Sequence, residues 1–135
     1  MFKHIFRALF CAVLACALTT ACSDENEADR LGVGAECTVM DDCYQADGEI
    51  PQDCLRQFAG GYCGVVGCAS NDDCPEASAC VAHTDGQNYC FRTCLDKSEC
   101  NVNRSVDNES NCSANIVFTD GAMGFKACVP PSSGV

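Results

Sequence analysis

Apolar residues gather near the start of this 135-residue chain, in an unbroken run over residues 8–18. Lys3 and Arg7 precede the run, and the small residues 19–21 follow it. As a helix the run would span about 16 Å, roughly half of the hydrocarbon core of a bilayer. A positive start, a short apolar run and a small-residue exit are typical of an export signal. We therefore expect residues 1–21 to be a signal peptide rather than a transmembrane helix.

Beyond residue 22 the apolar runs are short, and no long stretch shows a helical period. Asp-Gly pairs stand at residues 47–48, 85–86 and 120–121. Between short apolar runs, Asp-Gly is a strong signal for a hairpin turn. The clearest candidate hairpin joins residues 116–119 to residues 125–129. We expect a small, loop-rich fold with short β-hairpins and little helix.

Cysteine is the dominant feature of the composition, with 15 residues, while Trp is absent. This proportion of cysteine is typical of a disulfide scaffold in an oxidising compartment. Large apolar residues are sparse beyond the signal, so we expect disulfides rather than a conventional apolar core to hold the fold.

The cysteines beyond residue 22 form three units of four, over residues 37–63, 68–90 and 94–128. Each unit opens with Cys-x5-Cys and carries an acidic residue before the second cysteine: CTVMDDC, CASNDDC and CLDKSEC. This repeat predicts one disulfide-stapled domain over residues 37–128. The predicted disulfide cysteines are Cys37, Cys43, Cys54, Cys63, Cys68, Cys74, Cys80, Cys90, Cys94, Cys100, Cys112 and Cys128.

Cys22 stands outside this repeat. Cys11 and Cys16 lie within the signal, and the 12 later cysteines can pair completely, which leaves Cys22 over. An unpaired thiol is unusual in a secreted protein. Parity therefore singles out Cys22 for a separate role.

The stretch Leu18-Thr19-Thr20-Ala21-Cys22 resembles the end of a bacterial lipoprotein signal. In that family the cysteine after a small residue is acylated and becomes the new N-terminus, which implies lipidation of Cys22. The family usually has Leu where this chain has Thr19. Lipidation of Cys16 and ordinary cleavage after Ala21 are the alternatives.

Two flanking segments lack apolar periodicity. Residues 22–36 contain five acidic residues and are expected to be a flexible, lipid-anchored linker. Residues 129–135 are expected to be a short tail.

The spacing Cys-x5-Cys-x5-Cys-x9-Cys of the second unit resembles the N-terminal region of Dickkopf-like secreted proteins and the nematode EB module. Cysteine-rich bacterial surface lipoproteins carry similar arrays. The resemblance implies an interaction or structural module rather than an enzyme. It also implies that the first cysteine of each unit pairs with the third and the second with the fourth, as in Cys68–Cys80 and Cys74–Cys90.

The charge limits the partners. Six basic and 19 acidic residues lie beyond residue 21, so we expect no binding to nucleic acid and little adsorption to anionic lipid. Residues 41–42 and 71–73 offer oxygen atoms that suit Ca²⁺. Asp also favours turns, and the Asp-x-Asp-x-Asp-Gly loop is absent, so a turn-forming role is favoured.

Catalytic and cofactor signals are weak. His83 is the only His beyond the signal, and it lies in a polar loop where we expect it to be solvated. The chain has no Cys-x2-Cys pair to indicate zinc or a redox site. We expect no enzyme activity and no cofactor.

These features predict an exported lipoprotein, anchored at an outer membrane or cell surface, that displays a disulfide-rich binding or structural module to a protein or cell-surface partner. The alternatives are a soluble secreted inhibitor or ligand-like effector, and a Ca²⁺-dependent adhesion module.

Overall fold

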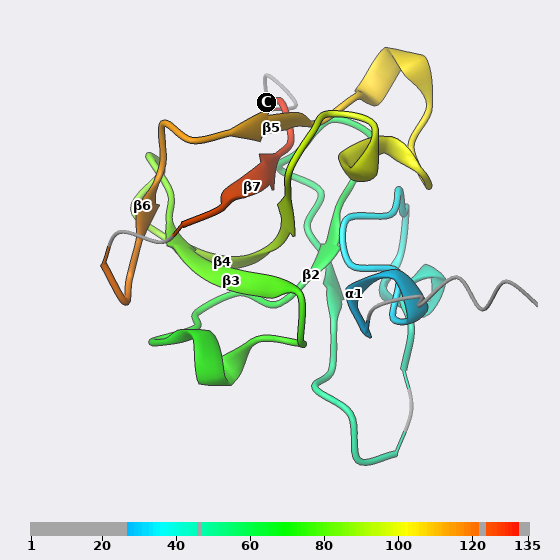
Figure 1. Ribbon diagram of the computed structural model, residues 1–135. Helices are drawn as coiled ribbons and strands as arrows, with labels where there is room; N and C mark the ends of the chain where they lie inside the picture. Colours follow the sequence, from blue (N-terminus) through cyan, green and yellow to red (C-terminus); the bar gives the residue numbers. More distant parts are fainter. Residues whose placement is uncertain (1–26, 46, 122–123, 133–135) are drawn as a thin grey trace, which may run out of the picture.

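The computed structural model describes residues 27–45, 47–121 and 124–132. Its elements are short, and most of the described chain is loop (Figure 1). The helices are α1 (Glu27–Arg30) and the 3-10 turns η1 (Met40–Asp42), η2 (Asn71–Asp73), η3 (Glu99–Asn101) and η4 (Val106–Asn108). The strands are β1 (Asp53–Cys54), β2 (Cys63–Gly64), β3 (Ser78–Ala82), β4 (Asn88–Cys94), β5 (Asn111–Ser113), β6 (Val117–Phe118) and β7 (Lys126–Val129). The expected class, a small disulfide-rich fold with short antiparallel strands and little helix, is confirmed.

The strands form two antiparallel sheets. Strands β1 and β2 pair with each other, and the larger sheet has the order β5-β7-β4-β3-β6. In Figure 1 the larger sheet lies to the left, with β2 and α1 to its right. Strands β3 and β4 form a hairpin in which Cys80 lies opposite Cys90. Its turn contains Asp85-Gly86, and Gly86 has a φ of +85°, which glycine adopts without strain. Here the Asp-Gly signal is confirmed.

The hairpin predicted between residues 116–119 and 125–129 is wrong. Both segments contain strands, but β6 pairs with β3, placing Phe118 opposite Val81. Strand β7 lies instead between β4 and β5, with Cys128 opposite Cys112. An apolar run shows that a segment is extended but does not select its neighbour.

Six disulfides staple the chain, and all of them lie within units. In each unit the first cysteine joins the third and the second joins the fourth, which is the pairing that the resemblance implied. The pairs are Cys37–Cys54, Cys43–Cys63, Cys68–Cys80, Cys74–Cys90, Cys94–Cys112 and Cys100–Cys128.

An apolar core also exists beside the disulfides, so the fold does not rest on the staples alone. Its centre is aromatic: Phe58 and Tyr62 from the first unit meet Tyr89 of the second unit and Phe91, which follows that unit in β4. The ring centroids of Phe58 and Tyr89 lie 5.3 Å apart, as do those of Tyr62 and Phe91. Phe118 and Ala127 of the third unit belong to the same cluster. The sparse apolar residues are thus concentrated in one place shared by the three units.

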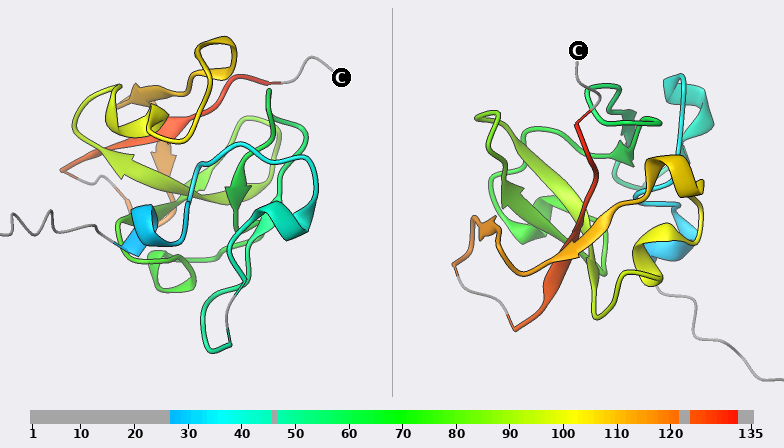
Figure 2. Two further views of the ribbon diagram at one scale, coloured as in Figure 1. Left: turned by 90° about the vertical axis from the view of Figure 1, so that its right-hand side faces the viewer. Right: turned by 90° about the horizontal axis from the view of Figure 1, so that it is seen from above.

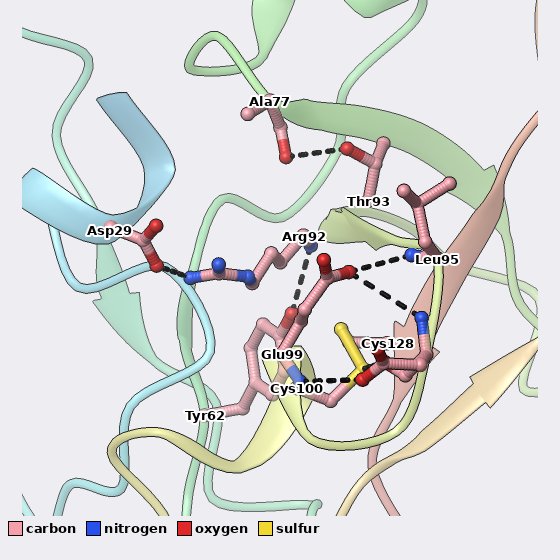
Figure 3. A network of polar contacts seen from close by, with 10 residues as sticks. Asp29, Tyr62, Ala77, Arg92, Thr93, Leu95, Glu99, Cys100 and Cys128 are labelled. Carbon is pink, nitrogen blue, oxygen red and sulfur yellow. Dashed lines mark hydrogen bonds and ion pairs between the residues drawn. A yellow bond between two sulfur atoms is a disulfide. The ribbon is translucent and has the colours of Figure 1, made fainter. Parts of the chain in front are cut away.

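The flexible linker predicted over residues 22–36 is also wrong for the part that the structure describes. Ala28, Leu31 and Val33 are buried in the core, at 0%, 1% and 3% exposure. Asp29 of α1 forms an ion pair with Arg92 of β4 (Figure 3). The Gln52 side chain donates a hydrogen bond to the carbonyl oxygen of Leu31 at 2.7 Å. Three apolar residues among acids are too few to show a helical period in the sequence. They are nevertheless enough to dock the segment against the apolar core.

The expected tail is partly ordered. Val129 ends β7, and Pro130 is buried. The backbone N–H of Ala59 donates to the carbonyl oxygen of Pro131 at 2.9 Å, and Ser132 forms a β-bridge with Phe58. The predicted tail is therefore wrong for residues 129–132. Residues 133–135, like the predicted signal peptide 1–21 and residues 22–26, lie outside the described part of the chain.

Candidate functional site

The three Cys-x5-Cys loops share one turn, and the acidic residue before the second cysteine closes it. Asp42 Oδ2 accepts hydrogen bonds from the backbone N–H groups of Thr38 and Val39, at 2.7 and 3.1 Å. Asp73 Oδ2 accepts from Ala69 and Ser70 at the same two distances. Glu99 Oε2 accepts from Leu95 and Asp96, at 2.6 and 3.5 Å (Figure 3). The acid is the shared feature because the turn leaves these N–H groups without backbone partners.

This role accounts for the acids that suggested calcium. The backbone N–H groups of Thr38 and Val39 hold the pKa of Asp42 below its ordinary value, and those of Ala69 and Ser70 do the same for Asp73. Across the described residues, the groups of three or more close-lying metal-ligand atoms consist of cysteines already in disulfides. Asp42 and Asp73 therefore act as turn formers.

The first unit differs from the other two units at the second and third residues between the two cysteines of this loop. It carries Val39 and Met40, which are 54% and 53% exposed. The second unit has Ser70-Asn71 and the third has Asp96-Lys97 at these positions. Because the same turn forms with polar residues, its geometry does not require the apolar pair.

Val39 and Met40 line an open groove of about 490 Å³ together with Arg56 and Gln57. We call these four residues the unit-one patch. A second groove, of about 620 Å³, adjoins the first at Thr38 and Arg56 and reaches Gly60 and Asn108. The left view of Figure 2 looks at the side of the molecule that carries both α1 and η1.

Arg56 makes no hydrogen bond or ion pair with any other described residue. The other arginines in the described chain are engaged. Arg30 pairs with Glu49 at 2.9 Å and Arg92 pairs with Asp29, while Arg104 donates to backbone carbonyls. Arg and Met are both enriched in protein interfaces, so an exposed, unpaired guanidinium beside the exposed Met40 favours an interface at this position.

The patch is held rigidly. The Cys37–Cys54 disulfide joins the η1 loop to the segment that carries Arg56, and Cys43–Cys63 closes the other end of the loop. Gly61 has a φ of +69°, and a Cβ there would lie 2.1 Å from the carbonyl oxygen of Cys37. This close approach requires glycine. A surface fixed in this way loses little conformational entropy when it binds.

His83 is not solvated as expected, because its side chain is 14% exposed. Its ring packs edge-on against Phe58 and Tyr89, at centroid distances of 5.4 and 5.7 Å. Its Nδ1 lies 3.2 Å from Asp85 Oδ1, while Asp85 Oδ2 accepts a hydrogen bond from the Tyr89 hydroxyl at 2.8 Å. His83 thus closes the edge of the aromatic core, beside Asp85 and Tyr89.

The structure describes some of the site residues predicted from the sequence and not others. The 12 cysteines of residues 37–128 are structural, whereas Cys22 lies outside the described residues. The unit-one patch was not predicted. Comparing CTVMDDC with CASNDDC position by position would have shown Val39 and Met40 as the departure.

No helix in the described part of the chain is long and apolar enough to cross a membrane. No protein family model, no curated protein and no solved structure matches the chain. The fold therefore carries the coarse conclusion by itself: this is a small disulfide-rich domain of the kind that serves as a structural or binding module, and its disulfides suit an oxidising, extracellular environment.

Proposed function

We propose that this protein is an exported binding module anchored to a membrane by a lipid on Cys22. The six disulfides use all 12 cysteines from Cys37 to Cys128, so the domain offers Cys22 no partner. Acylation removes the remaining thiol, and the apolar signal before Cys22 supports that modification. The anchor would hold the domain at an outer membrane or cell surface.

The observation that carries the binding role is the unit-one patch. Val39 and Met40 are exposed at two turn positions where the other two units carry polar residues. A purely structural repeat has no use for them, and exposed apolar side chains reduce solubility. We infer a protein or cell-surface partner rather than a substrate. The acidic surface opposes nucleic acid.

Because the N-terminal segment is docked in the core from Ala28 onward, the proposed tether between the lipid and the domain is shorter than the predicted linker. Residues 22–27 can span at most about 22 Å when fully extended. The lipid would therefore keep the domain close to the bilayer surface. A soluble secreted inhibitor or effector, the alternative proposal, would use the same patch without this restriction.

Metabolic labelling with a radioactive fatty acid tests the anchor. The wild-type chain, expressed in a bacterial host, should incorporate label and fractionate with membranes. Cys22→Ser should lose the label, while Cys16→Ser should keep it. Export of an unlabelled wild-type protein into the medium would instead establish the soluble alternative.

A further inference from the structure

We propose that the unit-one patch binds a protein segment that presents an aliphatic side chain next to a carboxylate. This inference rests on the proposed binding function and names the chemistry of the partner. It is independent of the anchor, because the patch has the same composition in a lipidated and a soluble chain.

The aliphatic half of the segment is matched by Val39 and Met40. Each side chain is about half exposed, so each still has apolar surface to bury. Met is unbranched and adapts its shape to varied apolar groups. Together with the groove of about 490 Å³ beside them, they can accept one side chain of the size of Leu, Ile or Met.

The carboxylate is matched by Arg56. Its guanidinium has five N–H donors in a planar fork that fits a carboxylate with two parallel hydrogen bonds. The acid nearest in sequence, Asp53, uses Oδ1 to accept from the backbone N–H of Cys54 at 2.7 Å. Asp42, which lines the adjoining groove, accepts from its own loop. Arg56 is thus a cation without a carboxylate partner among the described residues, and it lies beside Val39 and Met40 in the groove.

The position of Arg56 indicates where each of the two groups of the segment would lie. Arg56 lines both grooves, so it stands at their junction, while Val39 and Met40 line the first groove alone. A segment lying across the junction would place its aliphatic side chain in the first groove and its carboxylate at Arg56. Neighbouring or near-neighbouring residues of an extended segment satisfy this arrangement.

A lipid surface also offers apolar and anionic groups, but it fits less well. A bilayer surface is broad and would meet Asp41, Asp53 and the other exposed acids together with the patch. The excess of acidic residues beyond residue 21 would repel anionic head groups. A narrow protein segment at Arg56 would meet only the acids that line the two grooves, Asp53 in the first and Glu36 and Asp42 in the second.

The test is a peptide-display selection on the full mature protein in detergent micelles, which keep the chain in solution with or without a lipid. A random 12-residue library is selected in parallel on the wild type and on V39S/M40N. The double variant carries the residues that the second unit has at the same positions of the same turn, so its fold should not change. We expect peptides enriched on the wild type alone, with Leu, Ile or Met within two positions of Asp or Glu.

The enriched consensus peptide then tests each half by fluorescence anisotropy. V39S/M40N and Arg56→Gln should each weaken its binding at least tenfold. Replacing the acid of the peptide by its amide should weaken binding to the wild type but have little further effect on Arg56→Gln, because the pair is already broken. Leu95→Asn, which changes an exposed residue in the matching loop of the third unit, should have no effect.

Three results would overturn the inference. Equal enrichment on the wild type and V39S/M40N would place binding on another surface and leave the binding function standing. Enrichment of peptides without an acid, or no enrichment, would reject the proposed partner chemistry. Binding of the wild type to anionic vesicles, lost in Arg56→Gln, would assign the patch to lipid. Fatty-acid labelling of Cys22 is a separate measurement, so failure of the anchor is distinguishable from each of these.

Discussion

Individual polar side chains join the three units, and Arg104 of the third unit makes the most connections. Its guanidinium donates hydrogen bonds to the carbonyl oxygens of Gly34 at 2.9 Å, Ala59 at 2.6 Å, Gly61 at 3.0 Å and Asn108 at 2.7 Å. It also lies over the ring of Tyr62, at 5.8 Å from the centroid. Arg104 therefore links the N-terminal segment, the first unit and the third.

Arg104→Lys should destabilise the domain by about 1–3 kcal/mol, because an ammonium has one nitrogen and cannot reach carbonyls on several sides. Urea unfolding with the disulfides intact measures the change. Arg56→Lys is the matched control: it makes the same substitution at an exposed site without a partner and should change stability by less than about 0.5 kcal/mol. Equal effects of the two substitutions would argue against the bridging role of Arg104.

The turn acids give the stability a defined dependence on pH. The pKa of Asp73 is lowered in the fold by the N–H groups of Ala69 and Ser70. A lowered pKa stabilises the fold above the ordinary Asp value of about 3.9, and this contribution is lost as the pH falls below it. Stability should therefore decrease in acid.

Asp73→Asn should lower the melting temperature at neutral pH and reduce its further fall between about pH 5 and pH 2, because the amide does not titrate. Asp72→Asn, at the adjacent position, should leave the acid-induced fall nearly unchanged. Differential scanning calorimetry of both variants and the wild type across this pH range measures the difference in melting temperature. Identical pH profiles of the wild type and Asp73→Asn would contradict the role of the turn acid.

At the scale of elements, the sequence predicted local features better than contacts between distant segments. The Cys-x5-Cys repeat indicated the three turns, and Asp85-Gly86 marked the β3–β4 hairpin, because these signals lie within a few residues of their effect. The partner of β6 was missed because sheet pairing depends on residues far away in sequence. Strand β3 offers an edge to Phe118, and this is visible only once the hairpin has formed.

The N-terminal segment shows a second limit. Its acids predicted a flexible linker, yet Leu31 is 1% exposed in the core. Composition averages over a segment, whereas docking depends on a few residues that fit a preformed site. The acid Asp29 itself contributes, by pairing with Arg92.

Leu31→Ala should cost about 2–5 kcal/mol of unfolding free energy, the usual range for a buried Leu. Leu95, which is 74% exposed, provides the same substitution at the surface, and Leu95→Ala should cost less than about 0.5 kcal/mol. The comparison is made by urea unfolding of the two variants beside the wild type. A negligible effect of Leu31→Ala would contradict the docking of this segment and support a flexible linker.

At the scale of the whole molecule, three stapled units surround one shared aromatic core. Each unit has its own cluster of cysteines, while the apolar cluster takes residues from the N-terminal segment and from all three units. The cysteine count predicted the staples, because an even set at repeated spacings has few other uses in an oxidising compartment. The core was not predicted, because its residues are spread thinly along the chain and meet only in the fold.

The candidate binding surface follows the same logic. The repeat made the three loops comparable, and the structure showed that their turns are alike, so the turn does not require the apolar pair Val39 and Met40. Cys22, the residue of the proposed anchor, is the cysteine that the six disulfides within residues 37–128 do not use.

The central claim is a lipid-anchored chain that begins at Cys22 and carries six disulfides. Intact mass spectrometry of the mature protein under non-reducing conditions tests it most directly. The account predicts a chain starting at Cys22, with added acyl mass and two hydrogens missing for each disulfide. A mature chain that carries no acyl mass, or one with free thiols among residues 37–128, would contradict it.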